Sequence, residues 1–473
     1  MPERQPIPAI EDEFSDASLG DPRRTQRLVT VAAGLAQRPS GSFPEAAESD
    51  AALEGTYRLL NNEAVKAEAI FAVHQRRSRQ RAQAHEQVLV VHDTTTFTFE
   101  GEPRKGLGPI LHKHGARGFF AHVALLVSPQ RQPLGVIGYE HFCRTQQSKS
   151  KRSRKTRMAD PENENKRWWN LVHKTQQQLP HGPRALHVMD READSYALLA
   201  QLQEHQYSFV IRLCSDRVLA PVDGDTEEPL RLSQWMASLE HVAERDVQLQ
   251  KRASKLPKTR KIHPPRKDRK ARLLISAASV QIQRPARLHQ DAPQTLSLNV
   301  VRVYEPDPPA NEDPVQWTLL TSEPIETAAD VERIVDAYRC RWVIEEYFKA
   351  LKAGCAFEKR QLESLDALLR ALAIFIPIAW RLLLLRSMAH QQPDTPADFA
   401  LTKGQLAILC TRPKHPLAPN ATVAQALLAI AALGGHIKNN GAPGWQTLGR
   451  GFEKLLWMEL GWAAAQPQTS DQS

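Results

Sequence analysis

Hydrophobic and polar positions in the middle of the chain alternate in short blocks. QVLVVHDTTTFTF has an apolar run followed by β-branched residues and predicts a buried strand reaching Asp93. FFAHVALLVS and PLGVIGYEHF, joined by the turn signal PQRQP, predict two more strands. A helix around 163–179, a strand ending on Asp190, a helix, another strand and the helix holding Glu345 follow. This order predicts an α/β fold with a mixed sheet.

The ends of the chain have helical patterns instead. The first 75 or so residues look helical, and one helix begins at the start signal Asp21-Pro22. Beyond residue 385 the chain is punctuated by proline and then becomes helical again. Short alternating segments between 215 and 305 surround a basic stretch and predict a β-rich insertion. We therefore expect an α/β core with this insertion, flanked by helical N- and C-terminal domains.

The most apolar run, ALAIFIPIAW at 371–380, lies between two arginines and contains Pro377. A helix that crosses a bilayer needs about 20 apolar residues, so this run predicts a buried helix and no membrane partner. Residues 1–20 are polar and acidic, and we expect no secretory signal.

Amino-acid composition indicates which kind of partner the protein binds and in which cellular compartment it works. A length of 473 residues suggests about two or three domains. The 62 Lys and Arg exceed the 53 Asp and Glu, and a pI near 9.3 makes polyanions plausible partners. The five cysteines are scattered without a C-x-x-C pair, which indicates a reduced, cytoplasmic protein and argues against zinc.

Two basic runs flank the predicted core. Residues 144–157 hold seven Lys or Arg and no acid, and residues 251–272 hold eleven and one Asp. Such runs are usually solvated, but this position favours phosphate contacts without sequence specificity. His112 and His114 in LHKHG are a weak metal signal, more typical of an exposed loop.

The stretch YRCRWVIEEYFKALK, 338–352, mixes a carboxylate with several cations. At about 100° per residue, one helix would place five polar side chains on a single face and a separate apolar stripe beside it. The polar face holds Tyr338, Arg341, Glu345, Lys349 and Lys352, and the stripe holds Ile344, Phe348, Leu351 and Cys355. The stripe predicts packing against the core, and the polar face predicts contact with a ligand.

Asp93, Asp190 and Glu345 are too far apart in sequence to meet except through the fold. Converging carboxylates repel one another, and hard divalent cations such as Mg²⁺ remove that repulsion. Two such ions roughly 3.5 to 4 Å apart can drive an in-line phosphoryl displacement. Taken singly, each Asp is more often a helix cap or loop residue, and Glu345 could pair with Lys349 on the next turn. Their combination carries the hypothesis.

VVHDTT, VMDREAD and the pattern Y-x2-R-x3-E-x6-K resemble the signatures of bacterial DDE transposases of the insertion-sequence-four family. LGDPRRTQRL, QWTLLTSEP and FVIR are similar to that family too, whereas residues 1–15, 144–165 and 390–440 match it poorly. The resemblance implies an RNase H-like catalytic domain over 74–388. It also implies an N-terminal domain over 1–73 that binds DNA ends and a C-terminal dimerisation domain over 389–473.

The resemblance also implies an activity. It implies cut-and-paste transposition with Mg²⁺, for which Mn²⁺ may substitute, through nicking at the transposon end, a DNA hairpin, and strand transfer into target DNA. The protein would act as a homodimer on double-stranded DNA in the bacterial cytoplasm, at the nucleoid when bound. Two alternatives stay open: a non-catalytic DNA-binding relative that inhibits transposition, and a structure-specific, metal-dependent nuclease.

Individual roles follow from the matched motifs. Asp93, Asp190 and Glu345 fall on the metal-binding catalytic triad. Phosphate contacts are implied for Tyr338, Arg341 and Lys352, and contacts with the flipped base and end DNA for Arg212, Lys349 and Trp317. Arg23, Arg24 and Arg27 match a basic N-terminal helix that contacts the end sequence.

Overall fold

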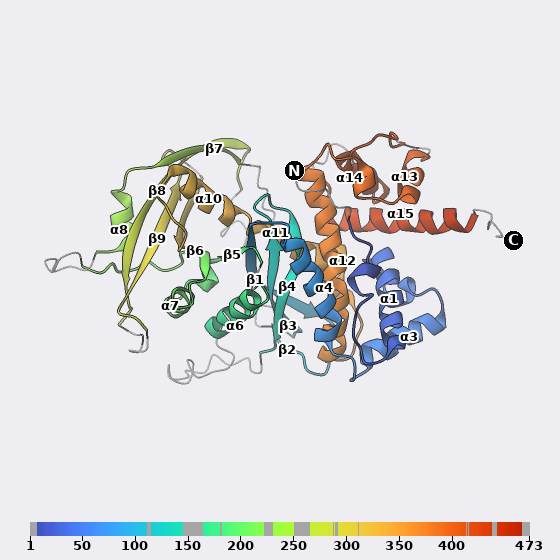
Figure 1. Cartoon of the computed structure of the whole chain (residues 1–473). Coiled ribbons are helices and arrows are strands. Elements are labelled where there is room, and N and C mark those ends of the chain that lie inside the picture. The colour runs from blue at the N-terminus through green and yellow to red at the C-terminus, as the bar shows by residue number, and fades with distance from the viewer. Residues whose placement is uncertain are drawn as a thin grey trace.

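The computed structural model describes most of the chain, and Figure 1 shows its arrangement. The described residues are 7–110, 115–144, 164–179, 182–221, 230–249, 265–286, 288, 292–310, 312–412, 414, 416–437 and 442–465. The basic residues 145–157 and 251–264, and both His112 and His114, lie outside this set.

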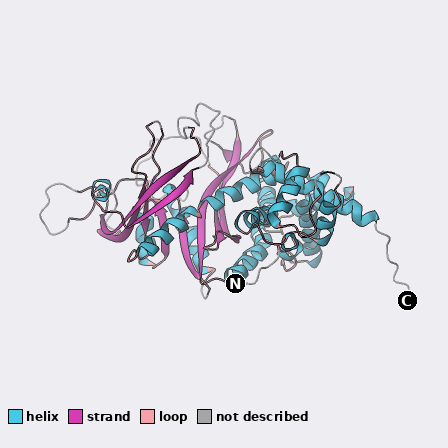
Figure 2. Cartoon of the chain, turned by 90° about the horizontal axis from the view of Figure 1, so that it is seen from above, coloured by secondary structure: helices cyan, strands magenta, loops and turns pink. Residues whose placement is uncertain are grey.

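One sheet runs through the molecule. Its described strands follow the order β2-β3-β1-β5-β6-β10-β9-β8-β7, with β4 paired to β3. The strands are β1 (Gln87–Phe99), β2 (Gly108–Pro109), β3 (Arg117–Val127), β4 (Pro133–Phe142), β5 (Arg184–Met189), β6 (Ser208–Arg212), β7 (Ala243–Leu249), β8 (Arg269–Gln283), β9 (Thr295–Tyr304) and β10 (Gln316–Thr321). Figure 2 shows the helices gathered towards one end and β8 and β9 towards the other.

The half of the sheet formed by β1 to β6 is mixed. Strands β1, β5 and β6 are parallel, whereas β3 pairs antiparallel with both β1 and β4. The predicted α/β fold with a mixed sheet and helices at both ends is confirmed. The β-rich insertion is present too, but it continues the same sheet, because β10 pairs with both β6 and β9.

Helices cover both faces of the half formed by β1 to β6. On one face α6 (Glu164–Gln177) packs against β3, β4 and α7 (Tyr196–Glu204). On the other, α4 (Ala67–Ala82), α11 (Trp342–Lys349) and α12 (Leu365–Gln391) pack against β4 or β1. Alternating residues of β1 serve the two faces, since Leu89 and Val91 join the α12 core and Val88 and Val90 join the α6 core.

The remaining described helices lie at the two ends of the chain and around the insertion. Asp21 caps α1 by accepting from the Arg23 amide at 2.8 Å, with Pro22 in the first turn, as the sequence predicted. These helices are η1 (Glu11–Glu13), α1 (Pro22–Gln37), α2 (Phe43–Ala46), α3 (Asp50–Asn61), η2 (Arg191–Ala193), α8 (Leu232–Ala237), α10 (Ala328–Arg339), η3 (Ala350–Gly354), η4 (Phe357–Lys359), η5 (Ala397–Phe399), α13 (Lys403–Cys410), α14 (Val423–Leu433) and α15 (Trp445–Ala465).

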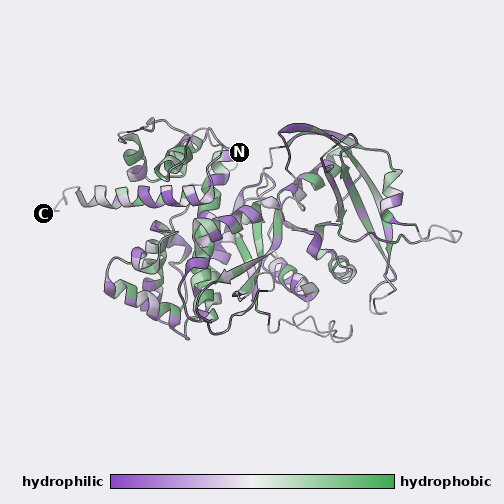
Figure 3. Ribbon diagram, turned by 180° about the vertical axis from the view of Figure 1, so that it is seen from behind, coloured by the Kyte–Doolittle hydropathy of each residue, from purple (hydrophilic) through white to green (hydrophobic). Residues whose placement is uncertain are grey.

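Helix α12 links the sheet to the terminal helices. The apolar run at 371–380 was expected to be too short for a bilayer, yet the helix around it has 27 residues and is long and apolar enough by composition. Its most apolar 18-residue window is 89% buried in the protein, which is typical of a core helix. The predicted buried helix is therefore confirmed. Figure 3 shows hydrophobic residues along the central strands as well.

Two local predictions are wrong. The strand expected to end at Asp93 continues to Phe99, because β3 pairs with β1 along its length up to Phe99 and Arg117. The single helix expected over 338–352 is divided: α10 ends at Arg339, α11 begins at Trp342, and a π-helical turn follows. The apolar stripe of that segment is nevertheless buried, as predicted.

Candidate active site

The parallel register of β1 and β5 brings two acids to the same level of the sheet, at the carboxyl end of β5. Val91 pairs with Val188, and Asp93 and Asp190 each lie two residues further along. Because parallel strands keep a constant register, the two acids take equivalent positions on neighbouring strands. Asp190 directly follows β5, where its Oδ1 accepts from the Glu192 amide at 2.8 Å and caps η2.

Glu345 reaches this level of the sheet from α11, and Arg341 joins it to Asp93. The Arg341 Nη1 lies 3.2 Å from Asp93 Oδ2, and its Nη2 lies 2.6 Å from Glu345 Oε1. The Arg341 side chain is only 9% exposed, compared with 16% for Asp93 and 32% for Glu345. Arg341, which the sequence assigned to phosphate, thus joins Asp93 of β1 to Glu345 of α11.

The electrostatics of Asp93 reflect this gathering. Burial, together with the nearby Asp190 and Glu345 carboxylates, raises the pKa of Asp93 to about 7, although the Arg341 charge and the Thr94 amide oppose this rise. An Asp that titrates near neutrality beside two other acids is typical of a functional site. The Asp93 Oδ1 accepts from the Thr94 amide at 2.7 Å, which fixes its orientation.

A divalent cation fits the chemistry of these donors. Three carboxylates with one strongly raised pKa form the oxygen-rich, anionic set that hard cations bind. The geometry is less complete: within the described ranges, no three His, Cys, Asp or Glu side chains are grouped closely enough to hold a metal ion. Arg341 pairs with Asp93 and Glu345 in this structure, and it supplies the positive charge between them.

Three of the predicted DNA contacts lie together next to the acids. Trp317 packs edge-on against Tyr338, with ring centroids 5.8 Å apart, and Arg212 lies beside the Tyr338 hydroxyl. Burial raises the pKa of Tyr338, while Arg341 and Arg212 oppose that shift and Asp190 adds to it. This cluster therefore borders the carboxylates through Arg341 and Asp190.

The two predicted lysines are engaged elsewhere. Lys352 donates to the Thr96 carbonyl of β1 at 2.6 Å, from the π-helical turn after α11. Burial lowers the pKa of Lys352, although Glu358 opposes this. Lys349 pairs with Glu346 at 2.6 Å on the surface, and Glu345 pairs with Arg341 in place of Lys349.

The N-terminal arginines are remote from this cluster. Figure 1 places α12 between α1 and the sheet, so Arg23, Arg24 and Arg27 lie on a different part of the molecule. Arg24 donates to the Leu19 carbonyl at 3.0 Å, while Arg23 and Arg27 are exposed. The structure does not bring them to the carboxylates.

Sequence reasoning missed two neighbours of the site. Trp342 is 50% exposed beside Arg341, whose guanidinium lies 4.8 Å from its ring centroid. Glu358 accepts from the Thr98 amide at 2.7 Å and so fixes η4 against β1. A tryptophan within the charged segment 338–352 was a detectable signal, whereas Glu358 had none because its partner is a backbone amide.

Comparison with protein families agrees with this geometry. Residues 7–65 match the family described as Transposase DNA-binding, and residues 159–376 match the family described as Transposase DDE domain. The second match includes Asp190 and Glu345, whereas Asp93 lies before it and is brought in by the register of β1.

The two matches together span more than half of the chain and support a DDE transposase with a DNA-binding domain. A DDE domain implies an RNase H-like core, in agreement with the mixed sheet, and supports a nuclease and strand-transferase enzyme. The matches also support DNA as the partner and DNA transposition and recombination as the process, and DDE transposases generally use divalent metal ions.

Proposed function

We propose that this chain catalyses cut-and-paste transposition as a member of the insertion-sequence-four family, and that it resembles the transposase of transposon Tn-five. The matching families support a DNA transposase, and the quoted motifs support the narrower assignment. The reaction would comprise nicking at the transposon end, hairpin formation, hairpin opening and strand transfer.

The observation that carries the proposal is the gathering of three acids from separate elements. Arg341 pairs with both Asp93 on β1 and Glu345 on α11. Asp190, after β5, lies close enough to raise the pKa of Asp93. An acid with a purely structural role usually pairs with its own basic residue. Several carboxylates close together are instead suited to bind a divalent cation and, through it, a phosphate.

Asp93, Asp190 and Glu345 would hold Mg²⁺, or Mn²⁺ in its place. When bound, a pair of such ions activates the attacking oxygen and stabilises the leaving oxygen of an in-line phosphoryl displacement. Asp93 must be ionised to serve as a ligand, and a cation favours that form. The cation would neutralise Asp93 and Glu345 in place of Arg341. The Arg341 guanidinium could then donate two hydrogen bonds to a DNA phosphate.

The neighbouring side chains would position the DNA end. The cluster of Arg212, Trp317 and Tyr338 combines a cation, an indole face and a hydroxyl, which together suit a phosphate and an unstacked base. Lys352 would have to leave the Thr96 carbonyl to reach phosphate, and Lys349 is already at the surface. Trp342 extends the aromatic surface beside Arg341.

The quaternary and cellular parts of the proposal have other support. Exposed Arg23 and Arg27 on α1, inside the Transposase DNA-binding match, suit the backbone of a transposon end. Large apolar side chains on α15, namely Trp457, Met458 and Trp462, are 45 to 49% exposed and suit a homodimer contact. The absence of a paired cysteine motif in the sequence suits the cytoplasm.

A plasmid that carries the ends of the native element tests the proposal. With Mg²⁺, the purified chain should release a fragment with hairpin ends and then insert it into target DNA, and Asp93→Asn should bind the ends without cutting. Binding without any cleavage by the wild type would indicate a non-catalytic relative. Cleavage without hairpins or insertion would indicate a structure-specific nuclease.

A further inference from the structure

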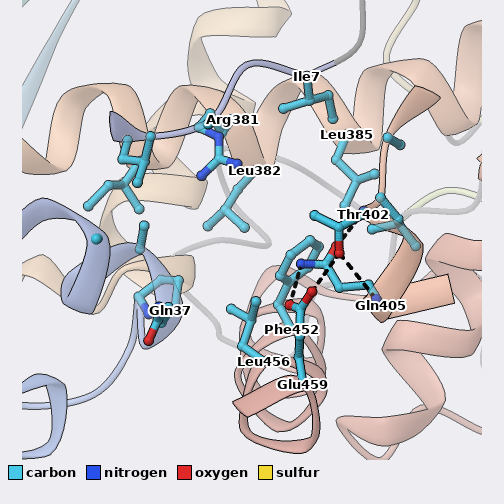
Figure 4. Close-up of a pocket in the computed structure, with 18 of the residues that line it drawn as sticks. Ile7, Gln37, Arg381, Leu382, Leu385, Thr402, Gln405, Phe452, Leu456 and Glu459 are labelled. Carbon is cyan, nitrogen blue, oxygen red and sulfur yellow. Dashed lines mark hydrogen bonds between the residues drawn. The ribbon is translucent and has the colours of Figure 1, made fainter. Parts of the chain in front are cut away.

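A cavity of about 400 Å³ lies at the junction of the N-terminal helices, α12 and the C-terminal helices, well separated from the candidate active site. Its walls come from the segment before η1, from α1, α12 and α13, and from α15 (Figure 4). Small-molecule sites commonly occupy roughly 300 to 1,000 Å³ and form where domains meet. The cavity has the size and the position of such a site.

Most of the cavity wall is apolar. Leu382 and Leu385 line it from α12, Phe452 and Leu456 from α15, and Ala36 from α1. Figure 4 shows the labelled leucines and Phe452 around one opening. A wall of this kind favours an apolar body over a hydrated inorganic ion.

Arg381 is the cation among the polar side chains of this wall, which are Glu11, Gln37, Arg381, Asp398, Thr402, Gln405 and Glu459. Its guanidinium projects from α12 into the opening in Figure 4. Its Nε is buried without a hydrogen-bond partner, and no described residue accepts a hydrogen bond from the rest of the guanidinium. Burial lowers the pKa of Arg381, and Glu11, Glu13 and Asp12 oppose this from a distance without pairing with it. A cation left in this state is electrostatically unfavourable.

Two of the nearby acids are already occupied, whereas Glu11 and Asp398 also line the cavity and make no ion pair with Arg381. Glu13 pairs with Arg81 at 2.7 Å and contacts His74 at 2.6 Å. Glu459, across the cavity, accepts from the Thr402 hydroxyl at 2.5 Å and from the Gln405 amide at 2.9 Å. Among the described residues, these two carboxylates are therefore not free to neutralise Arg381.

We propose that this cavity binds a small amphipathic carboxylate, with its head group on Arg381 and its apolar body against Leu382, Leu385 and Phe452. A carboxylate accepts two parallel hydrogen bonds from a guanidinium, which matches the unsatisfied donors. The apolar wall then provides affinity that an inorganic anion cannot gain. Neither the transposase families nor the proposed reaction assigns a ligand here.

Such a ligand would contact both α1 and α15, for which different functions are proposed. One wall belongs to α1, whose arginines are the proposed contacts with end DNA, and another to α15. Binding would stabilise this junction, because a ligand that binds only the folded arrangement favours it. The site thus offers a route by which a cellular carboxylate affects the docking of the N-terminal domain.

Calorimetric titration of the full chain with decanoate, decanol and inorganic phosphate tests the inference. Decanoate should bind at one site per chain, at least roughly tenfold more tightly than decanol, because a charge-assisted hydrogen bond of this kind is worth about that much. Arg381→Gln should remove the preference for decanoate over decanol. Arg450→Gln, an equal charge change on α15 outside the cavity wall, should leave it intact.

A second variant keeps the test decisive if Arg381→Gln folds poorly. Leu382→Trp should fill the cavity and abolish decanoate binding while DNA binding persists. Three results would overturn the inference: equal affinity for decanoate and decanol, unchanged decanoate affinity in a folded Arg381→Gln or Leu382→Trp variant, or phosphate binding as tightly as decanoate. The last would mean a simple anion site.

Discussion

Asp93 gives the protein a stability that depends on pH. Its pKa is about 7 in the folded chain and 3.8 in a model peptide, so the folded state holds a proton that the unfolded state has lost between these pH values. Stability is therefore greatest at low pH in this window and falls as the pH rises towards 7, where the folded carboxyl finally ionises. Asp93, the proposed metal ligand, therefore weakens the fold at neutral pH.

Asp93→Asn should consequently stabilise the metal-free protein at pH 8. Since one pH unit corresponds to about 1.4 kcal/mol, we expect the free energy of unfolding to rise by roughly 1 to 3 kcal/mol, after allowance for partial exposure. The gain should vanish at pH 4. Urea unfolding with a chelator at both pH values measures it, and a stabilised variant at pH 4 but not at pH 8 would contradict the assigned titration.

Metal affinity should follow the same titration in the opposite direction. A metal ligand must be deprotonated, so Mn²⁺ affinity should rise between pH 6 and pH 8 as Asp93 ionises. Calorimetry in buffers of different ionisation enthalpy should detect about one proton released per site at pH 6. A constant affinity and no proton release across this range would show that Asp93 does not ligate.

At the scale of elements, a buried network fixes η1 to α4. Burial raises the pKa of Glu13, but His74 and Arg81 outweigh it and lower the pKa to about 2. His74 accepts from the Val136 amide at its Nε2, so its Nδ1 carries the proton donated to Glu13. His74 is neutral here, because burial lowers its pKa, and Arg81 is the cation that keeps Glu13 ionised.

Glu13→Gln should therefore destabilise the fold by roughly 3 to 5 kcal/mol at pH 7, because a buried Arg81 loses its partner. A group with a lowered folded pKa stabilises the protein above its unfolded pKa, and this contribution is lost as the pH falls from about 4.5 to 2. Thermal unfolding at pH 7 and pH 3 measures the difference. Glu48→Gln, an exposed neighbour, is the control.

The packing of α15 on α14 depends on two glycines. A Cβ at Gly451 would lie 1.9 Å from the Ile430 carbonyl oxygen, and one at Gly434 would lie 1.9 Å from the Thr447 carbonyl oxygen. Gly451→Ala should thus lower stability by about 1 to 3 kcal/mol through overpacking. Gly461→Ala on the same helix meets nothing within 4 Å and should be neutral or stabilising by up to about 1 kcal/mol. Equal effects in urea unfolding would contradict this helix packing.

Sequence patterns predicted elements well where a local period carries the signal. The apolar run from Val88 to Val91 identified its strand correctly, and the apolar stripe of Ile344 and Phe348 identified the buried face of α11. The break between α10 and α11 left no such mark, because Cys340 and Arg341 are compatible with a continuous helix. The Glu13 network was invisible because its members are up to 68 residues apart.

The active site shows the same division between residue type and geometry. The acids could be predicted because motifs fix their residue types, and the structure confirms that Asp190 directly follows β5. The pairing of Arg341 with Asp93 and Glu345 could not be predicted, because it depends on the angle at which α11 meets β1. The roles of these residues in metal and DNA binding stay predictions.

At the scale of the whole molecule, the net charge of +9 predicts salt-dependent DNA binding. Changing Lys251, Lys255 and Lys258 to Ala should weaken binding to all DNA sequences and reduce the slope of log affinity against log salt by about 2 to 3. Lys174→Ala, Arg245→Ala and Arg333→Ala together are the control, because each of these cations is already paired with an acid and lies outside the Transposase DNA-binding match. An unchanged slope would mean that the run at 251–272 is merely solvated.

The central claim is that one fold gathers Asp93, Asp190 and Glu345 to bind divalent cations. Electron paramagnetic resonance of Mn²⁺ at pH 8, which counts free ions in the presence of protein, tests it without relying on activity. Wild type should bind Mn²⁺, and Asp93→Asn, Asp190→Asn and Glu345→Gln should each lose at least about tenfold in affinity. Glu346→Gln, a neighbour on α11 that accepts from Trp445, should bind as wild type does. Wild-type affinity in all three triad variants would contradict the claim.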